Sequence, residues 1–166
     1  MSVRLTAAIL SMLFSATCFA GSLPAPTGDV ILIISGNISH SNIAGTAQFD
    51  RAMLDALPQQ HFTTTSPWTE GPHRYDGVLL KELLITVGAQ SASVTLKALN
   101  DYHVTLELAP IADYPVLVAM KSDGKVMRVR DKGPLWLLYP MTDYPELDSQ
   151  KNHLNMIWQL DRIEVE

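Results

Sequence analysis

Two short stretches of the sequence combine an indole ring with charged side chains. One begins with an arginine and an aspartate, passes through a Gly-Pro turn and becomes an apolar run with two aromatic rings. The other places a tryptophan two residues before a glutamate in a loop. An aromatic ring stacks on a nucleobase-sized ring with about 1–3 kcal/mol, a carboxylate accepts paired hydrogen bonds, and an arginine donates them. Both stretches therefore carry the side chains that a flat heteroaromatic ligand requires. The candidate ligand-binding residues are Trp68, Glu70, Arg130, Asp131, Trp136 and Tyr139.

Most of these residues also have an ordinary structural interpretation. Trp136 lies in a run of strand length and suits a core position equally well. Arg130 and Asp131 equally suit an exposed ion pair of a turn, which would contribute little to stability. Glu70 suits a solvated loop. Trp68 follows a proline in a polar loop where no core is expected, so a functional role is favoured for it.

The sequence contains no recognisable catalytic or metal-binding motif. The five histidines show no spacing that would place two of them together on one helix or hairpin, so a zinc site is not indicated. No glycine-rich phosphate loop and no Gly-x-Ser-x-Gly turn occur. The only cysteine is Cys18, near the start of the chain. No catalytic residues and no metal ligands are therefore assigned from these motifs.

The first twenty residues have the layout of a secretory signal peptide. Arg4 precedes an apolar run too short to span a bilayer as a helix, and small residues lead to a plausible cleavage site after Ala20. A lipoprotein anchored at Cys18 is the alternative, although the preceding residues lack the usual lipobox pattern. We expect a periplasmic product with no transmembrane segment in the mature chain. The expected organisation is a signal peptide at 1–20, a linker at 21–28 and a single domain at 29–166.

The charge balance excludes one class of partner. The chain has 12 Lys and Arg against 17 Asp and Glu, a net charge of −5, and loss of Arg4 would make it more acidic. Nucleic-acid binding depends on a basic surface that replaces phosphate counterions. A nucleic-acid partner is therefore not expected. Cleavage after Ala20 would also remove Cys18, leaving no thiolate as nucleophile or metal ligand.

The remaining pattern predicts an α+β domain built on a mixed or antiparallel sheet with few helices. Apolar residues at helical spacing predict a helix over 49–57, and a second helix is expected to be capped by Asp76 and to end at Gly88. Residues 147–158 have a weak helical pattern. Asn100-Asp101 is the expected turn of a hairpin. Strands are expected at 30–34, 61–65, 94–99, 104–108, 115–120, 126–129, 135–139 and 163–165.

Three segments carry a resemblance to a known family. They are Tyr-Asp-Gly-Val-Leu-Leu-Lys-Glu-Leu-Leu at 75–84, Gly-Pro-Leu at 133–135 followed by Tyr-Pro at 139–140, and the stretch 158–165. In this order they resemble the molybdopterin-binding domain of the sulfite-oxidase type, over about residues 60–166. Each motif alone is weak, and the three in order are moderately specific. The resemblance implies a sulfite-oxidase-type fold with a mixed β-sheet.

The sequence departs from the enzymes of this family at three places. The family binds molybdenum through a cysteine in the loop before the 75–84 motif, and residues 63–70 contain no sulfur. Trp136 stands where the family has an arginine, and Ile157 where it has a lysine. A phosphorylated, metal-bearing cofactor needs cations and a soft ligand. The molybdenum cofactor is therefore not expected. The part of it that would still fit is the flat bicyclic ring, without phosphate or metal.

Small exported proteins of this fold without the metal cysteine are similar to periplasmic pterin-binding regulators. That resemblance implies an unphosphorylated, metal-free pterin as the ligand. It also implies docking on the periplasmic domain of an inner-membrane signalling protein, such as a cyclic-di-GMP enzyme. If the loops of Trp68 and Trp136 converge, both indoles could enclose the ring, and replacing either with alanine should weaken binding without unfolding the protein.

Two other functions remain open from the sequence. One is a molybdopterin-dependent oxidoreductase subunit whose metal has an oxygen or nitrogen ligand in place of sulfur. The other is a ligand-free adaptor that uses the fold as a protein-binding surface. Metal content distinguishes the first from a pterin-binding protein, and a thermal shift with pterin distinguishes the second.

Overall fold

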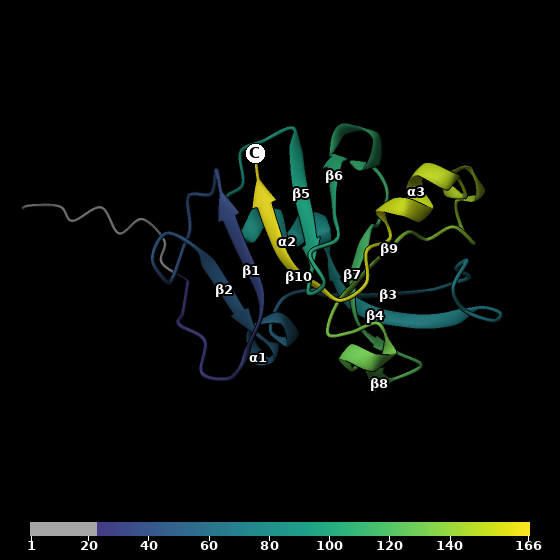
Figure 1. The fold of residues 1–166 in the computed structure, drawn as a ribbon, viewed down its shortest axis with the longest axis horizontal. Helices are drawn as coiled ribbons and strands as arrows, with labels where there is room; N and C mark the ends of the chain where they lie inside the picture. Colours follow the sequence, from purple (N-terminus) through teal and green to yellow (C-terminus); the bar gives the residue numbers. More distant parts are fainter. Residues whose placement is uncertain (1–22) are drawn as a thin grey trace, which may run out of the picture.

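The computed structural model describes residues 23–166, which form two five-stranded sheets (Figure 1). The predicted signal peptide, residues 1–20, lies outside the described residues. The strands are β1 (Val30–Gly36), β2 (Ala47–Asp50), β3 (Gln59–Thr64), β4 (His73–Leu79), β5 (Ser93–Ala98), β6 (His103–Glu107), β7 (Leu117–Ser122), β8 (Lys125–Val126), β9 (Trp136–Leu138) and β10 (Leu160–Val165). The helices are α1 (Arg51–Asp55), α2 (Leu80–Thr86), α3 (Gln150–Asn155) and the 3-10 turns η1 (Ala109–Ile111), η2 (Val129–Asp131) and η3 (Pro145–Leu147).

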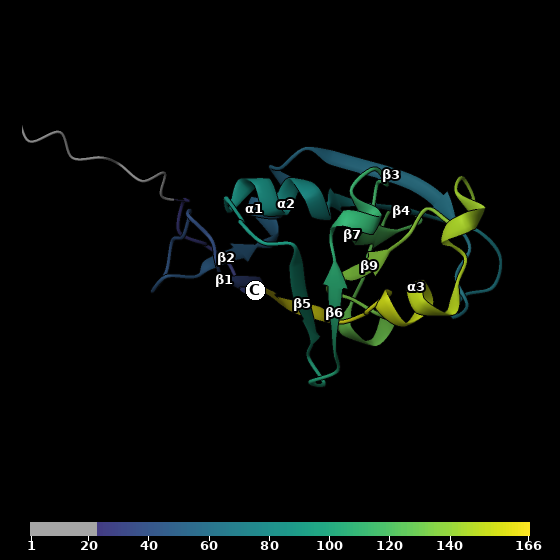
Figure 2. The ribbon, with the colours of Figure 1, turned by 90° about the horizontal axis from the view of Figure 1, so that it is seen from above.

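The first sheet is mixed, in the order β2-β1-β10-β5-β6. The central strand β10 runs parallel to its neighbour β1, and the other pairs are antiparallel. The β-branched run of β1 buries Leu32 and Ile34 completely, which suits a strand in the middle of a sheet. Figure 2 shows α1 and α2 on one face of this sheet. The predicted hairpin is confirmed as β5 and β6.

The second sheet is antiparallel, in the order β3-β4-β7-β8, with β9 also paired to β7. Buried apolar side chains from both sheets form one continuous core. At Gly77 the backbone of β4 lies very close to that of its paired strand β7, and a Cβ at this position would collide with the carbonyl of Val118. The helix α3 packs against β6, at the end of the molecule that carries the second sheet (Figures 1 and 2).

The helix predicted to be capped by Asp76 begins later than expected. Residues 73–79 pair with β3 on one side and β7 on the other, and this ladder overrides the helical spacing of the leucines. The helix α2 starts at Leu80, and its N-cap residue Leu79 makes no side-chain cap. Asp76 instead accepts hydrogen bonds from Nε and Nη2 of Arg74, at 3.1 and 2.8 Å.

The predicted helix over 49–57 is also shorter than expected. Phe49 belongs to β2, and α1 begins only at Arg51. Asp50 ends the strand and caps the helix, because its carboxylate accepts from the backbone N–H of Met53 at 2.8 Å. The same carboxylate accepts from the N–H groups of Thr27 and Gly28, at 2.7 and 2.8 Å. The described end of the predicted linker is thereby fixed to the domain.

The C-terminal third differs from the sequence pattern in two places. The weakly helical stretch 147–158 divides into the end of η3, the two-turn helix α3 and an extended segment at 156–158. Of the strand predicted at 126–129, only Val126 is paired, and Val129 begins the 3-10 turn η2. Among residues 23–166, no helix has the length and apolar composition needed to cross a bilayer.

Candidate functional site

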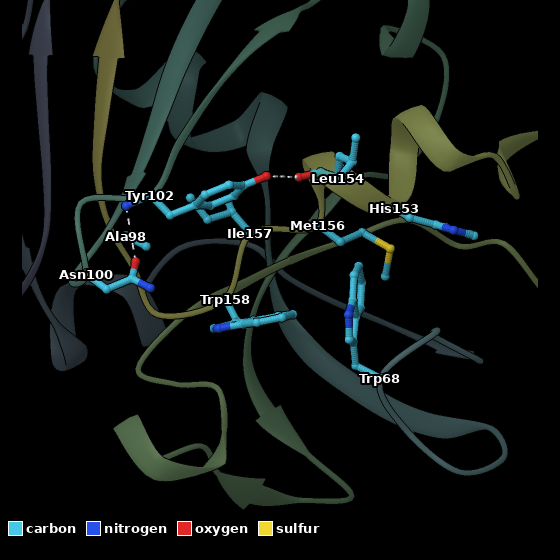
Figure 3. A pocket seen from close by; sticks show the side chains of 9 residues that line it. All are labelled: Trp68, Ala98, Asn100, Tyr102, His153, Leu154, Met156, Ile157 and Trp158. Carbon is cyan, nitrogen blue, oxygen red and sulfur yellow. Dashed lines mark hydrogen bonds between the residues drawn. The ribbon is translucent and has the colours of Figure 1, made fainter.

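A cavity of about 320 Å³ opens between α3, the β5–β6 turn and the loop after β3 (Figure 3). This volume is at the lower end of the range for small-molecule pockets. No lysine, arginine, aspartate or glutamate lines it. Its walls are aromatic and aliphatic side chains with few polar groups, which is the usual composition of such a site. The lining residues are Trp68, Ala98, Asn100, Tyr102, His153, Leu154, Met156, Ile157 and Trp158.

Trp68 reaches the cavity from a tight turn after β3. The buried Ser66 organises this turn, since its hydroxyl lies 2.7 Å from Thr69 Oγ1 and accepts from the Trp68 N–H at 3.3 Å. The backbone N–H of Thr69 also donates to the Ser66 carbonyl, at 3.3 Å. Serine and threonine hydroxyls commonly replace backbone partners in such turns. The hydroxyl groups next to Trp68 therefore fix the turn from which its ring reaches the cavity.

Trp158 reaches the cavity from the extended segment that precedes β10. This segment lies along β9, where Trp136 and Trp158 form an isolated bridge and the Leu137 N–H donates to the Ile157 carbonyl at 2.9 Å. The Nε1–H of Trp136 donates to the Met156 carbonyl at 3.0 Å. The apolar strand β9 thus fixes the wall of the cavity that Met156 to Trp158 supply.

The three indoles form one aromatic cluster. The ring of Trp68 lies 5.1 Å from that of Trp158 and 6.4 Å from that of Trp136, both in edge-to-face arrangements. The ring of Trp136 packs edge-on against Tyr75 at 5.5 Å, and that of Trp68 against His153 at 6.3 Å. Edge-to-face contacts of this kind are favourable beyond the area they bury. The two stretches singled out in the sequence therefore meet in space.

The opposite side of the cavity is formed by the β5–β6 turn and α3. The hydroxyl of Tyr102 donates to the Leu154 carbonyl at 3.2 Å, which connects the turn to the end of α3 (Figure 3). His153 faces away from this bond, and its Nε2 lies 2.7 Å from Oδ1 of Asp148. Asn100 lies at the turn end of the cavity.

Trp136 and Tyr139 do not line the cavity. Their side chains are 1% and 0% exposed, so direct contact with a ligand would require a rearrangement of the core. Trp136 instead packs against the ring of Trp68 from within the core. Burial raises the pKa of Tyr139 to about 12, and its hydroxyl has no hydrogen-bond partner among the described residues. The structure favours the core interpretation of Trp136 and places Tyr139 in the core as well.

Arg130, Asp131 and Glu70 also lie outside the cavity. Arg130 is exposed in η2. The main partner of the Asp131 carboxylate is Arg128, whose Nε donates a hydrogen bond to Oδ2 at 2.7 Å. That hydrogen bond lowers the pKa of Asp131. Glu70 is exposed, and only its backbone carbonyl is engaged, 3.0 Å from Nε2 of His73. These charged residues form a solvated surface next to the aromatic cluster.

Of the six predicted site residues, Trp68 is the one that lines the cavity, and its contact with a ligand remains a prediction. In the sequence, Trp158 was included only as the start of the 158–165 motif and Asn100 only as a turn residue. His153 was considered only as a metal ligand, and Tyr102 and Met156 were not considered. A tryptophan at the start of a terminal strand could have suggested Trp158, but no local pattern indicates that a hairpin turn and a short helix enclose it. Among residues 23–166, no three His, Cys, Asp or Glu side chains gather where they could hold a metal ion.

Comparisons with known proteins establish the fold. No family model matches the chain, and no curated protein sequence matches it. Among solved structures, it is similar to the sulfane dehydrogenase SoxCD from Paracoccus pantotrophus, with a TM-score of 0.59, 17% identity and coverage of 81% of this chain. The match spans 37% of the SoxCD chain. The predicted fold class is confirmed: an α+β domain of the sulfite-oxidase type, with mixed strands and few helices.

Proposed function

We propose that this protein is a periplasmic pterin-binding protein, not an enzyme, and that its ligand is an unphosphorylated, metal-free pterin. The observation that carries the proposal is a cavity that no lysine, arginine, aspartate or glutamate lines and that the indoles of Trp68 and Trp158 wall. A pterin is a flat heteroaromatic ring, and stacking on aromatic side chains is worth about 1–3 kcal/mol for a comparable base. Trp68 lies in the loop where the resemblance places the metal cysteine of the enzymes.

The charge of the cavity supports a ligand without phosphate. Phosphate groups in proteins are held by arginine, lysine or clustered backbone N–H groups. No lysine or arginine lines this cavity, and the nearby Arg130 points into solvent with its side chain 71% exposed. A phosphorylated cofactor would therefore lose hydration without gaining a cation. A ring without phosphate does not need a cation in its site.

A surface beside the cavity suits the proposed regulatory role. Residues 125–132, here called the basic segment, contain four Lys or Arg and the exposed Val126 and Val129, in an otherwise acidic protein. Exposed apolar side chains interspersed with arginine are typical of protein interfaces. We assign this segment as the docking surface for an inner-membrane signalling partner, such as a cyclic-di-GMP enzyme.

Two contacts connect the cavity to the basic segment. Gln159 follows Trp158 directly, and it donates from its backbone N–H to the Lys132 carbonyl at 3.0 Å and from Nε2 to the Val129 carbonyl at 2.9 Å. Lys132 Nζ also lies 5.6 Å from the centroid of the Trp136 ring, within cation–π range. A ligand that orders Trp68 and Trp158 would bias the conformation of the segment, and a partner that binds one conformation would sense the ligand.

Pterin binding can be tested by quenching of pterin fluorescence with the purified protein. We expect saturable binding by the wild type, and affinity reduced about tenfold or more by Trp68→Ala and by Trp158→Ala, since each removes a stacking surface. Tyr114→Ala is the matched control, because Tyr114 is a partly buried aromatic residue that does not line the cavity. Affinities that stay equal in all four proteins would contradict the site.

The two other functions have distinct outcomes in the same preparation. Stoichiometric molybdenum in the protein as purified would favour an oxidoreductase with a non-cysteine ligand. A protein that contains no small molecule and whose melting temperature does not change with pterin would favour a ligand-free adaptor.

A further inference from the structure

The side chain of Asn100 is held in one orientation by its own turn. Its Oδ1 accepts from the backbone N–H of Tyr102 at 3.2 Å. An amide has one acceptor atom and one donor atom, so a neighbouring N–H fixes which end faces it. The Nδ2 end is consequently turned the other way, and Figure 3 shows it directed toward Trp158. At this end of the cavity, Asn100 presents hydrogen-bond donors.

The turn that carries Asn100 is fixed by backbone hydrogen bonds on both sides. The Ala98 N–H donates to the Tyr102 carbonyl at 2.9 Å, and the Asp101 N–H donates to the Ala98 carbonyl at 3.0 Å. The Leu99 N–H donates to the Gln159 carbonyl at 3.0 Å, which joins the turn to the residue after Trp158. Asn100 is therefore positioned relative to the indole of Trp158 before any ligand arrives. Preorganised polar groups of this kind determine specificity at low entropic cost.

The Tyr102 hydroxyl and the carboxylates of the protein do not take this role. The Tyr102 hydroxyl already donates to the Leu154 carbonyl, and no carboxylate lines the cavity. Within residues 23–166, Nδ2 of Asn100 donates to no protein acceptor at hydrogen-bond distance. A ligand edge that lies on Trp158 and points toward the turn therefore meets an unused donor.

We infer that Asn100 is a specificity-determining residue that donates a hydrogen bond to an acceptor on the edge of the bound ring. The cavity then selects a heteroaromatic ligand with a carbonyl at that edge over one with an amino group in the same place, because two facing donors leave both unsatisfied. This inference rests on the proposed function. It adds the orientation of the bound ring, which the proposed function does not specify.

The test compares two ligands and two proteins. The ligands are pterin and diaminopteridine, in which an amino group replaces the ring carbonyl, at a pH at which both rings are neutral. The variant is Asn100→Asp, which keeps an oxygen for the Tyr102 N–H and places a carboxylate oxygen in the position of Nδ2. We expect the wild type to bind pterin roughly tenfold more tightly than diaminopteridine, and Asn100→Asp to reverse that preference.

A neighbouring substitution controls for charge and folding. Asp101→Asn changes the same kind of side chain in the same turn, and asparagine tolerates the left-handed backbone of Asp101, with φ of 65°. Asp101 does not line the cavity, so this variant should keep the wild-type preference. Circular dichroism and melting temperature check that each variant is folded.

The possible outcomes separate the two claims. If the wild type binds pterin and Asn100→Asp has the same preference as the wild type, the role of Asn100 is overturned while the proposed function stands. If the wild type binds neither ring, the proposed function fails and the inference fails with it. Asp101→Asn changes the charge of the turn in the opposite sense to Asn100→Asp. A clear change of ligand preference in Asp101→Asn, in either direction, would overturn the inference, because the effect would then be one of turn charge.

Discussion

The three tryptophans differ in exposure, and their replacement should therefore have different effects. Trp136 is 1% exposed, donates to a buried carbonyl and packs against two other rings, whereas Trp68 and Trp158 are partly exposed at the cavity. From the sequence we expected the loss of either Trp68 or Trp136 to leave the fold intact. Because Trp136 is buried, we expect instead that its replacement lowers the stability of the fold.

We predict that Trp136→Ala lowers the free energy of unfolding by about 3–5 kcal/mol, the usual cost of removing a buried aromatic side chain. Trp68→Ala should cost markedly less, because its ring is already partly in water. Urea unfolding of both variants followed by tyrosine fluorescence or circular dichroism measures the difference. Equal losses for the two variants would show that Trp68 is part of the core.

Next to the basic segment, His73 and Asp123 form an ion pair with a predictable pH dependence. Nδ1 of His73 lies 2.7 Å from Oδ2 of Asp123, and this hydrogen bond raises the pKa of His73 above 6.5 and lowers that of Asp123. A raised histidine pKa means that the pair's stabilisation is complete below the unfolded value and is lost as pH rises through the folded value.

NMR titration of the His73 ring should therefore give a pKa above the ordinary histidine value of 6.5. In Asp123→Asn the His73 pKa should fall toward the ordinary value, and the pH dependence of stability between neutral and mildly alkaline conditions should weaken. A His73 pKa that is the same in both proteins would contradict the pairing.

At the scale of elements, the sequence predicted most strands and misplaced the starts of the helices. Alternating apolar residues located β5 and β6, and the continuous β-branched run located β1, because these patterns are those of strands with one buried face or two. Leu80, Leu83 and Leu84 were correctly assigned to a helix, but Leu79 ends β4 and Asp76 is not the cap. Pairing of β4 with two neighbours is a long-range property, and no local window contains it.

The site was less predictable than the fold for the same reason. Trp68 could be recognised because an indole in a polar loop has no core to join. The partners of Trp68 come from a hairpin turn, a short helix and the segment before β10, which are adjacent only after both sheets have formed. Charge next to an aromatic residue in sequence, as at Arg130 and Trp136, did not imply proximity in the cavity, because η2 turns the charges outward.

The connection between the cavity and the basic segment is a property of these elements, and it can be tested through Gln159. Gln159→Asn keeps a residue that tolerates the left-handed backbone (φ of 54°) but shortens the side chain that reaches the Val129 carbonyl. We predict that pterin slows amide exchange of Asp131 and Gly133, whose N–H groups bond to Arg128, in the wild type and less in the variant.

Hydrogen exchange with and without saturating pterin measures this effect. The variant should bind pterin with nearly wild-type affinity, since Gln159 does not line the cavity. Ligand-induced protection that is equal in both proteins would contradict the proposed path through Gln159, and protection absent from both would contradict coupling itself.

At the scale of the whole molecule, the chain is acidic, with the basic segment as a local exception. A net charge of −5 gives no general attraction to nucleic acid, and the basic segment concentrates four Lys or Arg in eight residues. The cavity lies next to this segment. The proposed function combines a ligand-binding cavity with an adjacent docking surface. What the comparison with solved structures shows is the fold, which is similar to that of a sulfane dehydrogenase structure.

The most direct test of the central claim is to release the bound small molecule from the native full-length protein with acid and to identify it by mass spectrometry. The account predicts a pterin without phosphate or metal, close to one per chain, and a large decrease in Trp68→Ala purified in the same way. A phosphorylated molybdopterin, or a released molecule that is not a planar heterocycle, would contradict it.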